Sequence, residues 1–197
     1  MTNRGLLRRH LRNAWVSTMH EVYAQQLINS ERSLQVHFAA RLMEEFKHDR
    51  VKRYLFVEPK LVLDQGQRIH PDLLICNSRE VIGAIELKYQ PNLPPRYVKD
   101  FATLDALNKG CTSVRLENKR YRGPGRGELG FRLSANLLFV WAGVYRSPRQ
   151  EIPATETTSI DASQLLTLHG VTRVDNEPDI FAKSGSKLSR LGSSTDR

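Results

Sequence analysis

The residue pattern of positions 70–89 brings together two carboxylic acids and a lysine. Asp72 begins a short apolar run, and Glu86 and Lys88 lie at the end of a second run rich in β-branched residues. A polar turn separates the two runs, so the pattern predicts a β-hairpin. Antiparallel pairing would place Asp72 across from about Ile85, one step from Glu86. The two carboxylates would therefore meet at the open end of the hairpin.

These groups suit the chemistry of phosphate esters. Glu86 and Lys88 share one face, because side chains alternate along a strand. Two neighbouring carboxylates repel each other unless a cation or a shared proton relieves the charge. Mg²⁺ takes one or two protein carboxylates and keeps several waters, which leaves room for a phosphate oxygen and an attacking water. Lys88 would orient that water or neutralise charge on the phosphorus. We predict Mg²⁺-dependent hydrolysis of phosphodiester bonds, with Mn²⁺ as a substitute ion.

Pro71-Asp72 followed by Glu86-Leu87-Lys88 resembles the motif of the PD-(D/E)XK nuclease superfamily. The order of predicted elements over residues 30–146 is similar as well, because a helix bearing an acid precedes the strands and a second helix follows the lysine. The resemblance implies an α/β fold of the restriction-endonuclease-like type, a mixed central β-sheet flanked by α-helices. It also implies a DNA nuclease, of the kind that acts in restriction, defence or repair.

The resemblance assigns roles to individual residues. Asp72 and Glu86 would bind the metal, and Lys88 would act as the catalytic base or as a stabiliser of charge. Glu31, in the first turn of a predicted helix, would be an additional acid, although the helix dipole favours a carboxylate there without any metal. Glu58, on the strand before the hairpin, competes for the same role.

Hydrophobic periodicity predicts the elements that must position these groups. In chain order they are a helix over 5–29 with Leu7, Leu11, Trp15, Val22 and Leu27 inward, a helix capped by Ser30 with Leu34, Phe38, Leu42 and Phe46 inward, a strand over 54–64 bent at Pro59, the hairpin, a helix over 97–107, a strand over 136–145 buried on both faces, and a short helix over 162–168.

Length and composition favour one main domain with appendages. The 197 residues are 40% hydrophobic, enough to bury one sizeable core. We expect an N-terminal helical extension over 1–29, a nuclease-like core over 30–150 and a C-terminal appendage over 151–182. The tail over 183–197 is rich in Ser, Gly, Lys and Arg, a composition that predicts disorder.

The formal charge of +9 indicates an anionic partner, most simply nucleic acid. Charge alone fits DNA, RNA or an anionic membrane surface equally. Two cysteines without the spacing of a zinc site indicate a reducing, cytoplasmic interior. No apolar stretch is long enough to span a bilayer, so we expect no membrane partner. A homodimer or a larger nucleoprotein complex would be compatible with the sequence.

The stretch 115–132 is rich in arginine and glycine and predicts a mobile basic loop that clamps a nucleic-acid backbone. The alternative is a linker whose charge only aids solubility. The predicted nucleic-acid contacts are Lys119, Arg120, Tyr121, Arg122 and Arg126, together with Lys99 at the start of the helix predicted over 97–107.

Two other functions are compatible with the same residues. The fold could bind nucleic acid without cutting it, or it could be a structural subunit of a larger complex that uses the N-terminal helix and the apolar strand over 136–145 for assembly.

Overall fold

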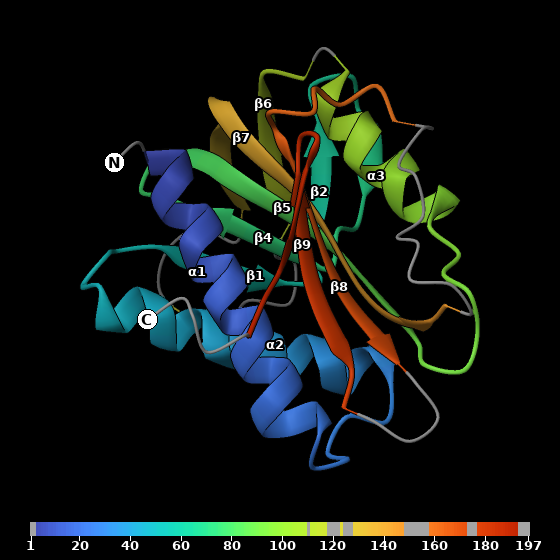
Figure 1. Ribbon diagram of the computed structural model, residues 1–197. Helices are drawn as coiled ribbons and strands as arrows, with labels where there is room; N and C mark the ends of the chain where they lie inside the picture. Colours follow the sequence, from blue (N-terminus) through green and yellow to red (C-terminus); the bar gives the residue numbers. More distant parts are fainter. Residues whose placement is uncertain are drawn as a thin grey trace.

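The computed structural model describes residues 3–109, 111–117, 123, 128–147, 158–172 and 177–192. Over these residues the fold is mixed α/β, a ten-stranded sheet with helices on both faces (Figure 1). The helices are α1 (Asn3–Ser17), the π-helix η1 (Thr18–Tyr23), α2 (Glu31–His48) and α3 (Val98–Asn108). The strands are β1 (Tyr54–Val57), β2 (Lys60–Leu63), β3 (Arg68–Ile69), β4 (Leu73–Cys76), β5 (Glu80–Gln90), β6 (Ser113–Glu117), β7 (Glu128–Arg146), β8 (Leu165–Thr172), β9 (Asp179–Ser184) and β10 (Lys187–Arg190).

The sheet is centred on β5 and β7, which run parallel to each other. Its main path is β1-β4-β5-β7-β6-β2-β3, and β8 extends it from the second half of β7, followed by β9 and β10. β4 and β5 form the predicted antiparallel hairpin. The open end of that hairpin therefore lies in the middle of the sheet, between helices on both faces.

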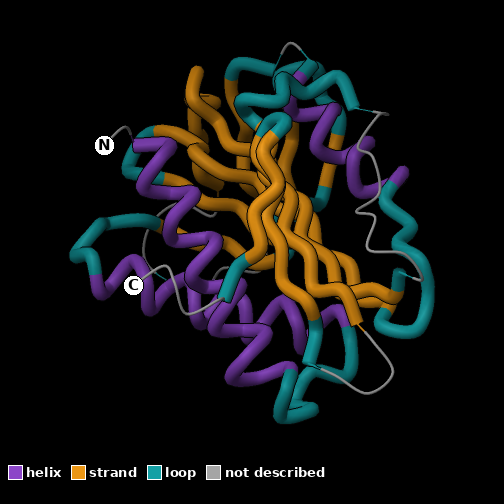
Figure 2. Tube along the Cα trace, viewed as in Figure 1, coloured by secondary structure: helices purple, strands orange, loops and turns teal. Residues whose placement is uncertain are grey.

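Two hydrophobic cores lie on opposite faces of the sheet. Figure 2 shows helices on either side of the strands. α1 and α2 cover one face and α3 covers the other. Along β7, Val140 and Ala142 belong to the first core, whereas Phe139 and Trp141 belong to the second. This alternation confirms the prediction of a strand buried on both faces.

α2 is the helix that carries Glu31, and its sequence determines where it begins. Ser30 Oγ accepts the backbone N–H of Ser33, and Ser33 Oγ accepts that of Ser30, so a reciprocal cap starts the helix. The four predicted apolar residues of α2 are all buried, which confirms that prediction: Leu34, Phe38, Leu42 and Phe46. Each contributes about 1.5–3 kcal/mol on burial. The cap and this stripe together hold Glu31 against the end of β5.

The prediction of one strand over 54–64 is wrong. Glu58 has a positive φ of 47° and Pro59 lacks an N–H, so the hydrogen-bond ladder breaks between β1 and β2. β1 pairs with β4 at one end of the path, whereas β2 pairs with β6 and β3 at the other. The sheet must curl strongly to join them.

Three further predictions are corrected. The N-terminal helix ends at Tyr23 rather than 29, and Leu27 is 55% exposed. Residues 162–168 do not form a helix, because the segment from Leu165 pairs with the buried β7 as strand β8. The tail from 183, which we expected to be disordered, contains the end of β9 and all of β10. Backbone pairing, with β7 in the first case and between β8, β9 and β10 in the second, outweighed local pattern in the last two cases.

The basic stretch 115–132 is not a continuous loop, because its two ends belong to β6 and β7, which pair as an antiparallel hairpin. The remainder of it, with Lys119, Arg120, Tyr121, Arg122 and Arg126, lies outside the described residues. None of the helices in the described part of the chain is both long and apolar enough to cross a membrane.

Gly143 is predicted to tolerate no side chain. A Cβ at Gly143 would lie 2.3 Å from the Trp141 ring, whereas a Cβ at Gly130, on the same strand, meets nothing within 4 Å. Gly143→Ala should therefore lower the free energy of unfolding by about 2 kcal/mol, the usual penalty of overpacking. Gly130→Ala is the control and should leave it within about 0.5 kcal/mol. Equal denaturant midpoints for both variants would contradict the placement of Trp141.

Candidate active site

The hairpin register brings Asp72 to Glu86. Leu73 lies opposite Ile85, so Asp72, one residue earlier, reaches the level of Glu86, close to the predicted register. Asp72 Oδ2 accepts the backbone N–H of Leu87 at 2.6 Å. Gln35 of α2, which is buried, donates its side-chain amide to the backbone carbonyl of Asp72 at 3.0 Å. Asp72 is thus fixed to β5 through its carboxylate and to α2 through its backbone carbonyl.

Glu86 is the more buried of the two acids, with 6% of its surface exposed. Burial raises the pKa of Glu86 to about 9, and the charges of Asp72 and Asp100 and a hydrogen bond with Asp72 add to the effect. Burial also raises the pKa of Asp72 to about 6, although the Leu87 N–H opposes that shift. Without a cation, the pair therefore holds a proton at neutral pH.

Lys88 lies between two further carboxylates. Its Nζ is 3.3 Å from Glu31 Oε2 and 3.5 Å from Asp100 Oδ1. Burial by itself lowers the pKa of Lys88, but the charges of Asp100 and Glu31 outweigh it and the pKa is raised. Lys88 is thus a half-buried cation at neutral pH. Glu31 Oε2 also accepts the backbone N–H of Tyr89 at 3.1 Å, so this carboxylate is fixed to β5 as well.

Asp100 is a site residue that the sequence reasoning missed. It is buried in the first turn of α3, and Trp141 Nε1 donates to its Oδ2 at 3.1 Å. A signal was present, because Asp100, Leu104 and Leu107 follow the spacing of one helical face. An acid on that apolar face needed a buried partner. Lys99, the residue proposed instead, is exposed.

Glu58 is not brought to the cluster. Its carboxylate accepts Arg32 Nη2 at 2.8 Å and 3.0 Å, and its side chain is 48% exposed. Only its backbone approaches the site, where the Glu58 N–H donates to the Asp72 carbonyl at 2.8 Å. Of the two acids that competed for the additional role, Glu31 is the one near Lys88.

The donor set fits an ion with few protein ligands. Within the described residues, no group of three or more Asp, Glu, His or Cys side chains is arranged to hold a metal ion. Asp72 and Glu86 form a pair, however, and Glu86 Oε1 is buried without a hydrogen-bond partner. Mg²⁺ needs one or two carboxylates and otherwise keeps its water, so this pair matches its requirements.

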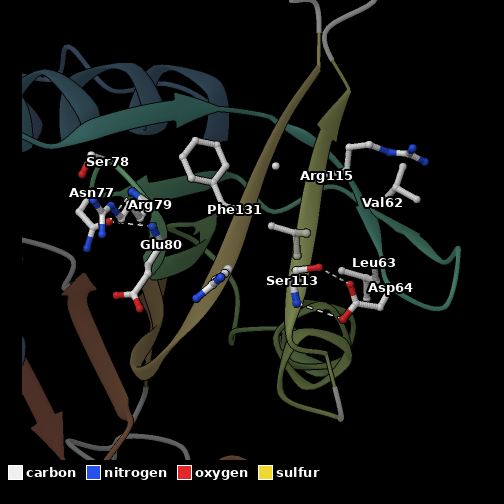
Figure 3. Close-up of a pocket in the computed structure, with 13 residues that line it drawn as sticks. Val62, Leu63, Asp64, Asn77, Ser78, Arg79, Glu80, Ser113, Arg115 and Phe131 are labelled. Atoms are coloured by element: carbon white, nitrogen blue, oxygen red, sulfur yellow. Dashed lines mark hydrogen bonds between the residues drawn. The ribbon is translucent and has the colours of Figure 1, made fainter.

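The largest hollow lies elsewhere, at the opposite end of β5 from the carboxylates. It measures about 1620 Å³, and its lining includes Arg79, Arg115 and Arg132. Figure 3 shows the turn from Asn77 to Glu80 on one side of it and Asp64, hydrogen-bonded to Ser113, on the other. Because the perturbed carboxylates lie at the hairpin's open end, we place the candidate active site there rather than in this hollow.

Without a metal ion, Glu86→Gln should be more stable than the wild type, by an amount that increases as the pH rises. Folded Glu86 keeps its proton up to a pH of about 9 rather than its ordinary 4.5, so rising pH between these values favours unfolding of the wild type. Gln has no such proton to lose. The gain over wild type should grow by about 1.4 kcal/mol per pH unit, or about 4 kcal/mol between about pH 5 and pH 8.

The measurement is denaturant unfolding in chelator at several pH values, with Glu44→Gln on the exposed side of α2 as the matched control. The control should follow the wild-type pH dependence. A constant difference between Glu86→Gln and wild type at all pH values would contradict the burial of an ionisable pair.

Comparisons with models of protein families, with curated proteins and with solved structures found no match to this chain. The case for its function therefore rests on the geometry of Asp72, Glu86 and Lys88 and of the acids around them.

Proposed function

We propose that this chain is a metal-dependent nuclease of the PD-(D/E)XK type, with a restriction-endonuclease-like fold, that hydrolyses phosphodiester bonds of DNA. One observation carries the proposal. Two carboxylates with raised pKa values, the half-buried Asp72 and the buried Glu86, lie at the open end of a hairpin, with the Lys88 ammonium on the same strand as Glu86. Perturbed acids beside a cation are typical of catalytic sites.

Asp72 and Glu86 would hold the Mg²⁺ ion. When bound, the ion supplies Lewis-acid stabilisation of the phosphate and activates water as a nucleophile. The two residues contribute fixed positions, since Asp72 is bonded to the Leu87 N–H and Glu86 is buried in β5. A dry, preorganised pair of carboxylates requires little rearrangement during the reaction.

Lys88 would stabilise negative charge on the phosphate. The Glu31 and Asp100 carboxylates keep its ammonium protonated, which favours a stabilising role over that of a general base. They also restrict its long side chain to one place. Trp141, bonded to Asp100, extends this arrangement into the second core.

The surface charge supports nucleic acid as the substrate. A chain of formal charge +9 attracts polyanions, and each phosphate contact gains from the release of counterions. DNA rather than RNA is favoured by the resemblance of the motif, and restriction, defence and repair all use such enzymes.

A second candidate function is nucleic-acid binding without cleavage, and the large hollow favours it. Arg115 and Arg132 lie on the same face of the β6–β7 hairpin, because Ser113 pairs with Arg132 and Arg115 with Gly130. Arg79 lines the same hollow. Guanidinium groups gathered in this way suit phosphate oxygens. Since this hollow lies at the opposite end of β5 from the carboxylates, it would bind nucleic acid without their help.

Cleavage should depend on the cluster. With Mg²⁺ and supercoiled plasmid, Asp72→Asn and Lys88→Ala should each lower the rate of nicking by about 100-fold or more, because each removes a group that positions or neutralises charge. Lys109→Ala, an exposed lysine at the end of α3, is the matched control and should cut like wild type. Nicking that is equal in all four proteins would refute the proposed active site.

Binding should depend on the arginines instead. Arg132→Ala should weaken the affinity for duplex DNA and reduce the slope of log K against log salt by about one unit, as expected for one lost phosphate contact. Lys187→Ala, on exposed β10, should leave the slope unchanged. An unaltered slope in Arg132→Ala would remove the hollow from the DNA interface.

A further inference from the structure

A second groove, of about 780 Å³, lies at the Tyr89 end of β5. Tyr89 lines it and follows Lys88 in the chain, and the Tyr89 N–H donates to Glu31 Oε2 at 3.1 Å. The Tyr89 hydroxyl donates to the carbonyl of Ile28, another lining residue, at 2.8 Å. One wall of the groove is thus bonded to the carboxylate that holds the proposed catalytic lysine.

Two tyrosine rings supply the apolar part of the groove. Tyr23 and Tyr89 pack edge to face, with ring centroids 6.5 Å apart and planes inclined by 68°. Both are only partly buried. The hydrogen bond to Ile28 fixes the Tyr89 ring, and η1 positions Tyr23. In η1 and the turn after it, the N–H groups of Ala24 and Leu27 bond to carbonyls five residues back. Such wide turns recur at functional sites.

The polar part of the groove consists of amides rather than cations. Gln26, Asn29 and Asn92 line it, and each side-chain amide offers both a donor and an acceptor. Gln26 has a φ of 60°, a left-handed conformation that is costly outside glycine and is often kept where function requires it. Among the described residues that line the groove there is no lysine or arginine, and Glu177 adds a carboxylate.

This composition distinguishes the groove from a phosphate site. In a chain of charge +9, a groove whose described lining has no lysine or arginine and has an acid at its edge is unfavourable for a phosphate. Aromatic faces with amide groups are instead the combination that binds an unpaired base, by stacking and by hydrogen bonds to its edge. Its volume falls in the range of small-molecule sites.

We propose that this groove holds an unpaired nucleobase next to the scissile phosphate. The inference rests on the proposed nuclease function and deepens it. The substrate would be nucleic acid with single-stranded nucleotides at the cleavage point, such as an overhang, a flap or a single strand, rather than a continuous duplex. Tyr23 and Tyr89 would stack on the base, and Gln26, Asn29 and Asn92 would contact its edge.

The test measures stacking in the absence of cleavage. The full chain carrying Asp72→Asn, in chelator, is titrated into an oligonucleotide duplex with a short overhang that contains 2-aminopurine. A blunt duplex, in which the same 2-aminopurine is paired internally, serves as the comparison. Stacking on the tyrosines should quench the fluorescence of the overhang probe, and its affinity should exceed that of the blunt duplex by about tenfold or more.

Three variants in the same background identify the groove. Tyr23→Ala should lower the affinity for the overhang by about tenfold and abolish the quenching. Tyr23→Phe keeps the ring and should retain both, which also excludes a loss of folding as the cause. Tyr54→Ala removes a tyrosine that is 41% exposed on β1, outside the groove, and should have no effect.

The outcomes separate this inference from the nuclease proposal. Equal affinity for overhang and blunt duplex, or unchanged fluorescence in the parent protein, overturns the base-binding groove even if Asp72 and Lys88 prove essential for nicking. Quenching that requires the Tyr23 ring supports the groove, and it would do so even if Asp72→Asn cut plasmid at the wild-type rate and the nuclease proposal failed.

Discussion

The interaction on which the rest of the site depends is the repulsion between the buried carboxyls of Asp72 and Glu86. Burial makes each charge costly, the Asp72 charge raises the pKa of Glu86 further, and the charges of Glu31 and Asp100 raise that of Asp72. The fold nevertheless holds them together, through the Leu87 N–H, the amide of Gln35 and the pairing of Leu73 with Ile85. This arrangement of two acids contributes little to the stability of the fold. We therefore interpret it as functional.

The charge of Lys88 lowers the pKa of both Asp72 and Glu86, although its ion pairs are with two other acids. It contacts Glu31 from α2 and Asp100 from α3, so helices on opposite faces of the sheet converge on one ammonium. The site thus has two parts, an acidic pair with an orphan oxygen on Glu86 and a cation held by two other acids. The first suits a divalent ion and the second suits a phosphate, and their adjacency is what makes phosphodiester hydrolysis the function that we propose.

In the proposed mechanism, the two hollows bind different parts of the nucleic acid. The larger, lined by Arg79, Arg115 and Arg132, has the charge for a backbone phosphate but lies far from the acids along β5. The smaller begins at Tyr89, one residue after Lys88, and its described lining has rings and amides instead of cations. Position and composition together assign the backbone to the first and a base to the second.

Local pattern was sufficient for the parts of this protein that depend on neighbours in the chain. The hairpin, the capped helix from Glu31, its buried stripe and the apolar β7 all follow from alternation, helical spacing and turn residues, and with them came Asp72, Glu86 and Lys88. Register along one hairpin is a local property, because a slip by one residue would turn every side chain to the wrong face.

Tertiary structure decided whatever depended on distant contacts. Glu31 and Glu58 were equivalent candidates until α2 brought one to Lys88 and Arg32 paired with the other. Helical spacing puts Asp100 on the apolar face of α3, but only the tertiary structure shows its contacts with Lys88 and Trp141. β8 became a strand only because β7 offered it unpaired backbone groups. In each case the deciding partner lies tens of residues away, where hydrogen bonds and burial outweigh the weak preferences of the local sequence.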